Sequence, residues 1–170
     1  MGYSTTFKGS IQVEPPLSPE EIKFLQGFAR TRRTQRKEGP YYVAPEQSKT
    51  VSFDQSVGQD YGNPNVTDMN NPPLGQPGLW CQWEPTDDGK AIEWNGSEKF
   101  YDSLEWMQYL MDHFIGPKPI ASQLPAFKFL KPHKCNGEIA AQGDDPSDQW
   151  KLVVKNGKCK RLRGVVHYEE

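Results

Sequence analysis

The chain has 170 residues, 35% of them hydrophobic, and a formal net charge of −2 at pH 7. This length suits one domain with its own core, so we expect residues 1–170 to form a single domain. No apolar run reaches the roughly 18 residues of a membrane-spanning helix, and the first residues lack the pattern of a secretory signal. The charge is uneven, with +4 on residues 1–37, −10 on 38–149 and +4 on 150–170.

The chain opens with features of a strand followed by a helix. Residues 3–13 alternate loosely and are rich in Thr, Val, Ile and Phe, which predicts a strand that ends before Pro15 and Pro16. Ser18 is the expected helix N-cap, and Glu21 completes a capping box. The helix is expected to end in a basic run, Arg30, Arg32, Arg33 and Arg36.

The basic run leaves two interpretations open. Cations at a helix C-terminus complement the macrodipole, which is a purely structural role. Alternatively, Arg32, Arg33 and Arg36 lie next to Tyr41 and Tyr42 in the sequence, an arrangement that can bind phosphate and stack a base.

A long polar loop follows, over about residues 38–78. It is rich in Pro, Gly, Asn, Asp, Ser and Gln, and within it only residues 41–43 and 50–53 suggest short strands. Loops of this length inside a domain are usually functional or disordered, so we expect binding residues in or beside it.

Residues 79–83 and 91–95 flank a turn containing Asp-Gly, which predicts a hairpin. Alternation places Leu79, Cys81 and Trp83 on one face and Trp80, Gln82 and Glu84 on the other. We expect the other tryptophans, Trp83, Trp94, Trp106 and Trp150, to be in the core. Trp80 is the ring expected to be exposed for binding.

A second helix is expected from Ser97 to Ile115, with Asn95 or Ser97 as its cap and Gly116 after its end. Its apolar face comprises Phe100, Leu104, Met107, Leu110, Met111, Phe114 and Ile115. On the opposite side, Glu98, Asp102 and Glu105 have the spacing of one helix face, and we interpret them as solvated.

The C-terminal quarter has the character of strands, including residues 127–130. Asn136-Gly137 and Asn156-Gly157 both predict two-residue hairpin turns, and Asp144 to Asp148 form the turn between them. The element order β, α, loop, β, β, α, β, β, β predicts an α+β fold. Its first six elements match a ferredoxin-like, split βαβ sheet with two helices on one face, extended by a C-terminal hairpin.

Three segments, residues 2–21, 78–107 and 136–158, are similar to a family of small bacterial and phage proteins of ferredoxin-like fold. That family has no assigned reaction to transfer. The resemblance implies a cytoplasmic, phage- or prophage-associated setting and a protein that binds a host component.

Catalytic motifs are missing from the sequence: there is no G-x-S-x-G, P-loop, H-E-x-x-H or G-x-G-x-x-G, and the three histidines are scattered. The three cysteines, Cys81, Cys135 and Cys159, form no C-x-x-C, which favours a reducing cytoplasm and no zinc site. We therefore expect no catalytic residue, cofactor or metal, although a hydrolase of unknown type stays open.

The sequence favours a non-enzymatic binding protein that acts on a host protein by surface occlusion. The residues expected to bind are Arg32, Arg33, Arg36, Tyr41, Tyr42 and Trp80. One alternative is sequestration of a small nucleotide, with arginines on phosphate and an aromatic ring on the base. A nucleic-acid-binding module is a further alternative, favoured if the two basic ends of the chain meet in the fold.

Overall fold

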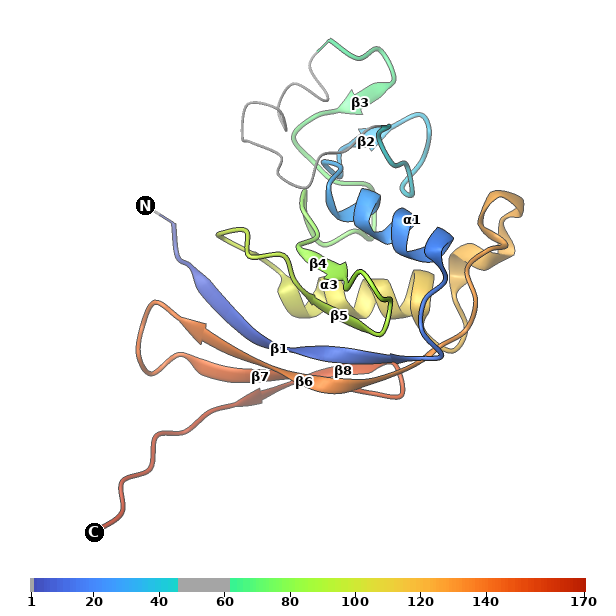
Figure 1. Cartoon of the computed structure of the whole chain (residues 1–170). Helices are drawn as coiled ribbons and strands as arrows, with labels where there is room; N and C mark the ends of the chain where they lie inside the picture. The colour runs from blue at the N-terminus through green and yellow to red at the C-terminus, as the bar shows by residue number, and fades with distance from the viewer. Residues whose placement is uncertain (1, 46–61) are drawn as a thin grey trace.

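The sheet is organised around its longest strands, β1 (Thr5–Glu14) and β6 (Lys134–Gly143), which pair antiparallel along their whole length (Figure 1). The computed structural model describes residues 2–45 and 62–170. The other sheet strands are β4 (Trp83–Pro85), β5 (Ala91–Trp94), β7 (Gln149–Lys155) and β8 (Lys158–Arg163). All neighbours are antiparallel, in the order β4-β5-β1-β6-β7-β8, so the C-terminal hairpin extends the sheet as expected.

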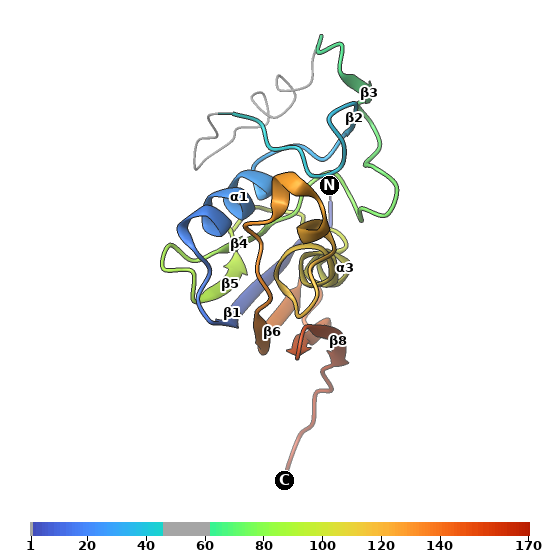
Figure 2. The same cartoon turned by 90° about the vertical axis from the view of Figure 1, so that its right-hand side faces the viewer.

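Two helices cover one face of this sheet, which makes the fold α+β (Figures 1 and 2). They are α1 (Pro19–Ala29) and α3 (Ser103–Leu110), and α3 continues into a π-helical turn, η1 (Met111–Ile115). Two short 3-10 turns, η2 (Ile120–Gln123) and η3 (Pro125–Phe127), lead to β6. A small second sheet, β2 (Gln35–Arg36) with β3 (Val66–Asp68), lies beyond α1 on the side away from the main sheet.

The core forms between the helices and the alternate strand residues that face them. In β1 these are Phe7, Ile11 and Val13, while their neighbours in sequence point to the opposite, uncovered face. Trp83 and Trp106 are fully buried among them. Burying two indoles between sheet and helices removes a large apolar area from water, which is why most of the tryptophans serve the core.

A buried ion pair joins the start of α1 to the start of β6. The capping box forms as predicted, because Ser18 Oγ accepts from the Glu21 amide and Glu21 Oε1 accepts from the Ser18 amide. Glu21 Oε2 also contacts His133 Nε2 at 2.8 Å, and the Lys131 amide donates to the same oxygen. His133 Nδ1 lies 2.7 Å from the Pro15 carbonyl oxygen.

Because both ring nitrogens of His133 face acceptors, both must donate, and the ring is an imidazolium. Burial alone would lower the pKa of His133, but its hydrogen bonds to Glu21 and Pro15 raise it above 6.5. Burial likewise acts to raise the pKa of Glu21, and the donors from His133, Ser18 and Lys131 bring it below 4.5.

The second helix begins later than the sequence predicts. Neither Asn95 nor Ser97 caps it: Asn95 Oδ1 accepts from the Ser97 amide in a local turn, and the helix starts only at Ser103. Its N-cap position is Asp102, which has φ 57°. Since Glu98 and Asp102 precede the helix, they do not share a helix face with Glu105, and that expectation was wrong. The end at Gly116 is confirmed.

Only one of the two Asn-Gly pairs is a turn. Asn156-Gly157 joins β7 to β8, with φ values of 52° and 77° that suit a two-residue hairpin. Asn136-Gly137 instead lies inside β6. A Cβ on Gly137 would come within 2.7 Å of the Ser10 carbonyl oxygen, so this glycine permits a close approach of β1 rather than a change of direction.

The structure differs from three other predictions about local structure. Residues 127–130 comprise the end of η3 and a turn after it, not a strand, and residues 41–43 are not a strand either. The expected short strand at 50–53 lies outside the described residues. The α-helix ends at Ala29, so Arg32, Arg33 and Arg36 lie past its end rather than in its last turn.

The buried Glu21–His133 pair predicts a stability that falls on both sides of an intermediate pH. The contribution of His133 is complete below about pH 6.5 and is lost as pH rises through its raised folded pKa. The contribution of Glu21 is complete above about pH 4.5 and is lost as pH falls through its lowered folded pKa. Urea denaturation at a series of pH values measures both limbs.

Removing one partner leaves the other charge buried alone, so Glu21→Gln is expected to lower the free energy of unfolding by about 3–5 kcal/mol. Glu20→Gln, an exposed position in the same helical turn, is the matched control and is expected to change it by less than about 0.5 kcal/mol. Equal effects of the two substitutions would contradict the role given to the pair.

Candidate functional site

A groove of about 720 Å³ lies between the C-terminal half of α1 and the β4–β5 hairpin. It is lined by Gln26, Ala29, Arg30, Trp80, Gln82, Glu84, Pro85, Thr86, Asp87, Glu93, Trp94, Asn95, Gly96 and Ser97. Trp80, Gln82 and Glu84 line it together, as the alternation predicts, while Cys81 and Trp83 between them are buried. The predicted strand at 79–83 is wrong in its bounds, because β4 begins only at Trp83 and residues 79–82 are not in a strand. The two sets of side chains still separate, one into the core and the other into the groove.

One wall of the groove is held by a hydrogen-bonded ion pair. Arg30 Nη2 lies 2.7 Å from Glu84 Oε1, and Asn95 Nδ2 donates to Glu84 Oε2 at 3.1 Å. Both charged side chains are mostly buried, with 16% and 11% exposure. This network ties α1 to both strands of the hairpin, so the two walls keep a fixed distance.

Two indoles contribute the apolar part of the groove. Trp94 is held in place, because its Nε1 donates to the Ser97 carbonyl at 3.2 Å and its ring meets Phe7 edge-on at 5.5 Å between centroids. Trp80 is half-buried. A rigid indole beside a partly open one offers a surface on which a flat or cationic group can lie.

The groove is electrically negative. Its lining holds one cation, Arg30, and three carboxylates, Glu84, Asp87 and Glu93. Arg30 is paired with Glu84. Asp87 accepts a long amide hydrogen bond from Gln26, at 3.4 Å. Glu93 is exposed and makes no ion pair within residues 2–45 and 62–170. The lining thus favours a cationic group over a phosphate.

Of the residues predicted to bind, Arg33 is the most deeply enclosed, with 2% exposure. Its guanidinium donates to the backbone carbonyls of Thr31, Pro40 and Tyr42. It also lies 4.1 Å above the centre of the Phe28 ring. These contacts fasten the segment after α1 to the helix, which gives Arg33 a structural role.

Arg32, Arg36 and Tyr42 are placed around the same segment. Arg32 donates to the Met69 carbonyl, which connects the segment after α1 to the later part of the long loop. Arg36 is buried, donates to the Thr34 hydroxyl at 2.8 Å, and has its guanidinium 4.5 Å from the centre of the Tyr42 ring. The structure brings Arg33, Arg36 and Tyr42 together, and the Arg33 amide donates to the carbonyl of Leu79, next to Trp80, at 2.8 Å. Trp80 lines the groove, whereas Arg33, Arg36 and Tyr42 do not.

Tyr41 belongs to a third environment, an aromatic cluster on the π-helical turn. Its hydroxyl lies 2.6 Å from His113 Nδ1, and its ring meets Phe114 edge-on. His113 stacks on Tyr109 at 3.9 Å between ring centroids. The Gly116 amide donates to the Met111 carbonyl, the spacing of a π turn, and π turns are frequent at functional sites. Nothing in the sequence pattern distinguished this turn from α-helix.

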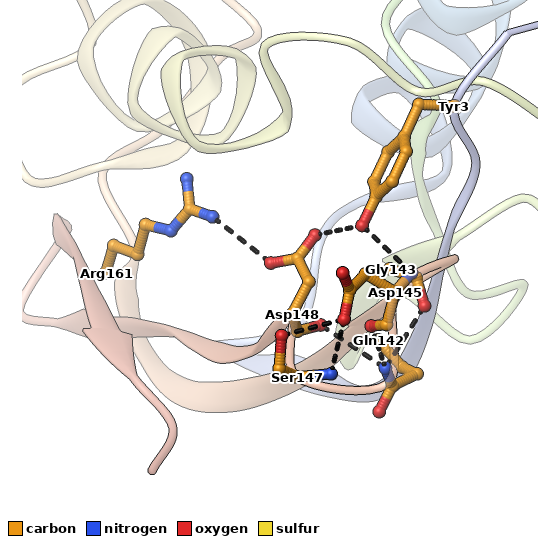
Figure 3. Close-up of polar contacts among 7 residues, drawn as sticks. All are labelled: Tyr3, Gln142, Gly143, Asp145, Ser147, Asp148 and Arg161. Carbon is orange, nitrogen blue, oxygen red and sulfur yellow. Dashed lines mark hydrogen bonds and ion pairs between the residues drawn. The ribbon is translucent and has the colours of Figure 1, made fainter.

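The acidic residues of the β6–β7 connection form the predicted turn (Figure 3). Tyr3 and Arg161 approach Asp148 from different sides: the Tyr3 hydroxyl donates to it at 2.6 Å, and Arg161 Nη2 lies 4.0 Å away. Asp145 is occupied by two hydrogen bonds from Ser147. These carboxylates stabilise the turn and the docking of the N-terminal residues.

Sequence reasoning found Trp80 but missed the other residues of the groove. Arg30 was assigned to the helix end, and Glu93 and Asn95 carry no motif. The available signal was the alternation of Trp80, Gln82 and Glu84, which marks a polar face next to a ring. Trp80, expected to be exposed, is half-buried, and Trp94, expected in the core, is half-buried and lines the groove.

Within the described residues no group of three or more His, Cys, Asp or Glu side chains is placed to hold a metal ion. The helices of those residues are also all too short or too polar to cross a membrane. Comparison with protein-family models, with curated proteins and with solved structures finds no match to this chain.

The enclosure of Arg33 predicts that its shape matters as much as its charge. Arg33→Lys keeps the charge but loses the planar fork, so we expect the free energy of unfolding to fall by about 1.5–3 kcal/mol. Urea denaturation measures this, with Lys37→Gln at an exposed neighbouring position as control. A stable Arg33→Lys variant would contradict the structural role.

The two buried or half-buried histidines are predicted to titrate on opposite sides of pH 6.5. Burial lowers the pKa of His113, against a small opposite effect of Asp112. The pKa of His133 is raised by Glu21 and Pro15 despite its burial. Two-dimensional NMR of the imidazole resonances measures both values, with His133→Gln to assign the peaks. A His113 that titrates above His133 would overturn the prediction.

Proposed function

We propose that this chain is a non-enzymatic protein-binding module whose groove receives an arginine or lysine side chain of a partner protein. The observation that carries the proposal is the combination of two indoles, Trp80 and Trp94, with two carboxylates, Asp87 and Glu93, that form no ion pair with any residue of 2–45 and 62–170. A cation over an indole gains about 0.5–2 kcal/mol, and more as water is excluded. A carboxylate beside the ring adds charge-assisted hydrogen bonds.

The shape of the edge strand supports recognition through side chains. β4 is the outer strand of the sheet, and it has only three residues, the last of them Pro85. Proline has no amide hydrogen to offer an added strand. A partner is therefore expected to insert a side chain into the groove rather than to extend the sheet.

The bound partner would be inhibited by occlusion, because capping a basic side chain also covers the surface around it. The sequence resemblance to bacterial and phage proteins makes a host protein with an exposed basic segment the partner to test first. Nucleotide sequestration is less favoured: Arg33 and Arg36 are buried against backbone or hydroxyl groups, and the groove carries more negative than positive charge.

We further propose that the central strands form a ferredoxin-like, split βαβ core. The support is the strand order, in which β5 lies between β1 and β4, and β1 lies between β5 and β6. The helix α1 joins β1 to β4, and β5 lies between these two strands. The helix α3 joins β5 to β6, and β1 lies between them, which is the arrangement of a split βαβ fold. The β2–β3 insertion and the β7–β8 hairpin are additions to that core. An experimental structure with another strand order would contradict this proposal.

Binding of labelled peptides tests the function. An arginine-rich peptide is expected to bind, an acidic peptide of the same length is not, and Trp80→Ala is expected to weaken binding by about tenfold or more, which corresponds to about 1.4 kcal/mol. Glu93→Gln is expected to weaken it less and to reduce its dependence on salt. Fluorescence anisotropy measures each affinity.

Tyr101→Ala is the matched control, because Tyr101 is an exposed aromatic residue that does not line the groove. Unchanged peptide affinity in Trp80→Ala, with the fold intact by circular dichroism, would refute the proposal. Binding of a nucleotide that is abolished by Trp80→Ala, without any peptide binding, would replace it with the sequestration alternative.

A further inference from the structure

The face of the sheet turned away from the helices is strongly basic. Its positions alternate with the buried ones, so they are identified by strand register. On β1, β6, β7 and β8 the charged residues of this face are Lys8, Lys134, Lys151, Lys155, Lys158 and Lys160, against Glu14 and Glu138, and all are exposed. Six lysines and two glutamates give this part of the face a net charge of +4, in a protein whose net charge is −2, while Glu84 and Glu93 are on the same register face at the β4 edge, in the groove.

A shallow hollow of about 640 Å³ lies on this face, across β1, β6, β7 and the end of β8. It is lined by Thr6, Lys8, Ala140, Ala141, Gln142, Gln149, Trp150, Lys151, Leu162, Arg163 and Gly164. Three of these are cations and none is a carboxylate. In the register, Ala140 separates Lys8 from Lys151, so the two long side chains flank a small one.

Two of the six lysines lie near glutamates: Lys151 Nζ is 3.2 Å from Glu138 Oε2, and Lys134 is directly opposite Glu14 in the register. The other four are not arranged to stabilise the fold. Lys155 and Lys158 are directly opposite each other in the β7–β8 pair, a like-charge pairing that destabilises a sheet. Lysines on an edge strand do discourage aggregation, which would account for Lys158 and Lys160. It would not account for Lys8 and Lys155 on inner strands. Within the described residues, Lys8, Lys155, Lys158 and Lys160 form no ion pair.

We propose that this lysine face binds the phosphate backbone of a nucleic acid duplex. Lysines two residues apart on a strand, such as Lys158 and Lys160, are separated by about 6.8 Å, which equals the axial rise of two phosphates of one strand. Neighbouring strands add parallel cations, so a duplex lying on the face meets several lysines at once.

The residues between the lysines indicate which kind of nucleic acid the face would bind. The uncharged, uncovered positions of β1 and β6 are Thr6, Ser10, Gln12, Asn136, Ala140 and Gln142, none of them aromatic. Trp150 lines the hollow but is buried, with the Arg161 guanidinium 4.2 Å from its ring centre, so it offers no open ring. Binding of single strands depends on aromatic rings that stack bases, and protein partners are typically anchored by buried aromatic residues. A face of lysines, small polar groups and the exposed Leu162 suits backbone contacts that are independent of sequence.

This site is distinct from the groove and does not rest on the function proposed for it. The groove lies at the β4 edge and has an excess of carboxylates, whereas the lysines gather toward the β8 edge. The Arg32–Arg36 run takes no part, because β2 lies on the opposite side of the molecule from β8 (Figure 1). The two basic segments of the sequence therefore do not form one patch.

Fluorescence anisotropy with a short labelled DNA duplex tests the proposal on the full chain. With about four phosphate contacts, affinity is expected to fall on the order of 100-fold between about 50 and about 200 mM KCl. The double variant Lys155→Gln/Lys158→Gln is expected to lower the slope of log K against log salt by about 2. The control, Lys118→Gln/Lys128→Gln, makes the same charge change at exposed positions outside the face and is expected to keep the slope.

A second measurement uses the unchanged protein and so does not depend on folding of the variant. Acetylation of lysines, quantified by mass spectrometry, is expected to be slowed by the duplex at Lys155, Lys158 and Lys160 and not at Lys118. No binding at low salt, equal loss in both double variants, or equal protection of Lys118 would overturn the proposal. So would tighter binding to an acidic peptide than to the duplex.

Discussion

The interaction on which the rest of the structure depends is the buried pair of Glu21 and His133. One carboxylate closes the capping box of α1, accepts the Lys131 amide and binds the imidazolium, which in turn binds the Pro15 carbonyl. Two chain segments that are far apart in sequence, residues 15–21 and 131–133, thus meet at two side chains. The pair fixes where α1 starts relative to β1 and β6, and the position of α1 in turn determines one wall of the groove.

The two hollows of the molecule have opposite electrostatic character, and the sheet keeps them apart. The groove at the β4 edge has three carboxylates and one arginine, while the hollow on the uncovered face has three cations and no carboxylate. At each site most of the charged side chains thus have the same sign, instead of being paired with opposite charges across the surface. Grouping charges of one sign lowers the stability of the folded chain through repulsion, and it attracts partners of the opposite charge.

Much of the local structure could be predicted because its signals are short in range. Ser18 and Glu21 form a capping box within four residues, and the alternation from Trp80 to Glu84 separates groove from core.

The predictions that failed depend on contacts between residues that are far apart in the sequence. Asn136-Gly137 has the composition of a turn, but the approach of β1 makes it part of a strand. Arg32 and Arg33 of the basic run find carbonyl partners within the long loop, at Met69, Pro40 and Tyr42, which no local pattern reveals. The ion pair between Arg30 and Glu84 spans 54 positions of the sequence and is equally invisible there.

The π-helical turn after α3 determines how the deletion of one residue would affect the contacts of this helix. A π turn holds one residue more than an α turn, and each helical residue advances the side-chain direction by about 100°. Deleting one residue from Met111–Ile115 would restore a regular α-helix and rotate His113 relative to the helix before it, away from Tyr41. The contact between this helix and the start of the long loop therefore depends on the one extra residue of the π turn. Related chains that lack the extra residue are expected to hold the loop by other means.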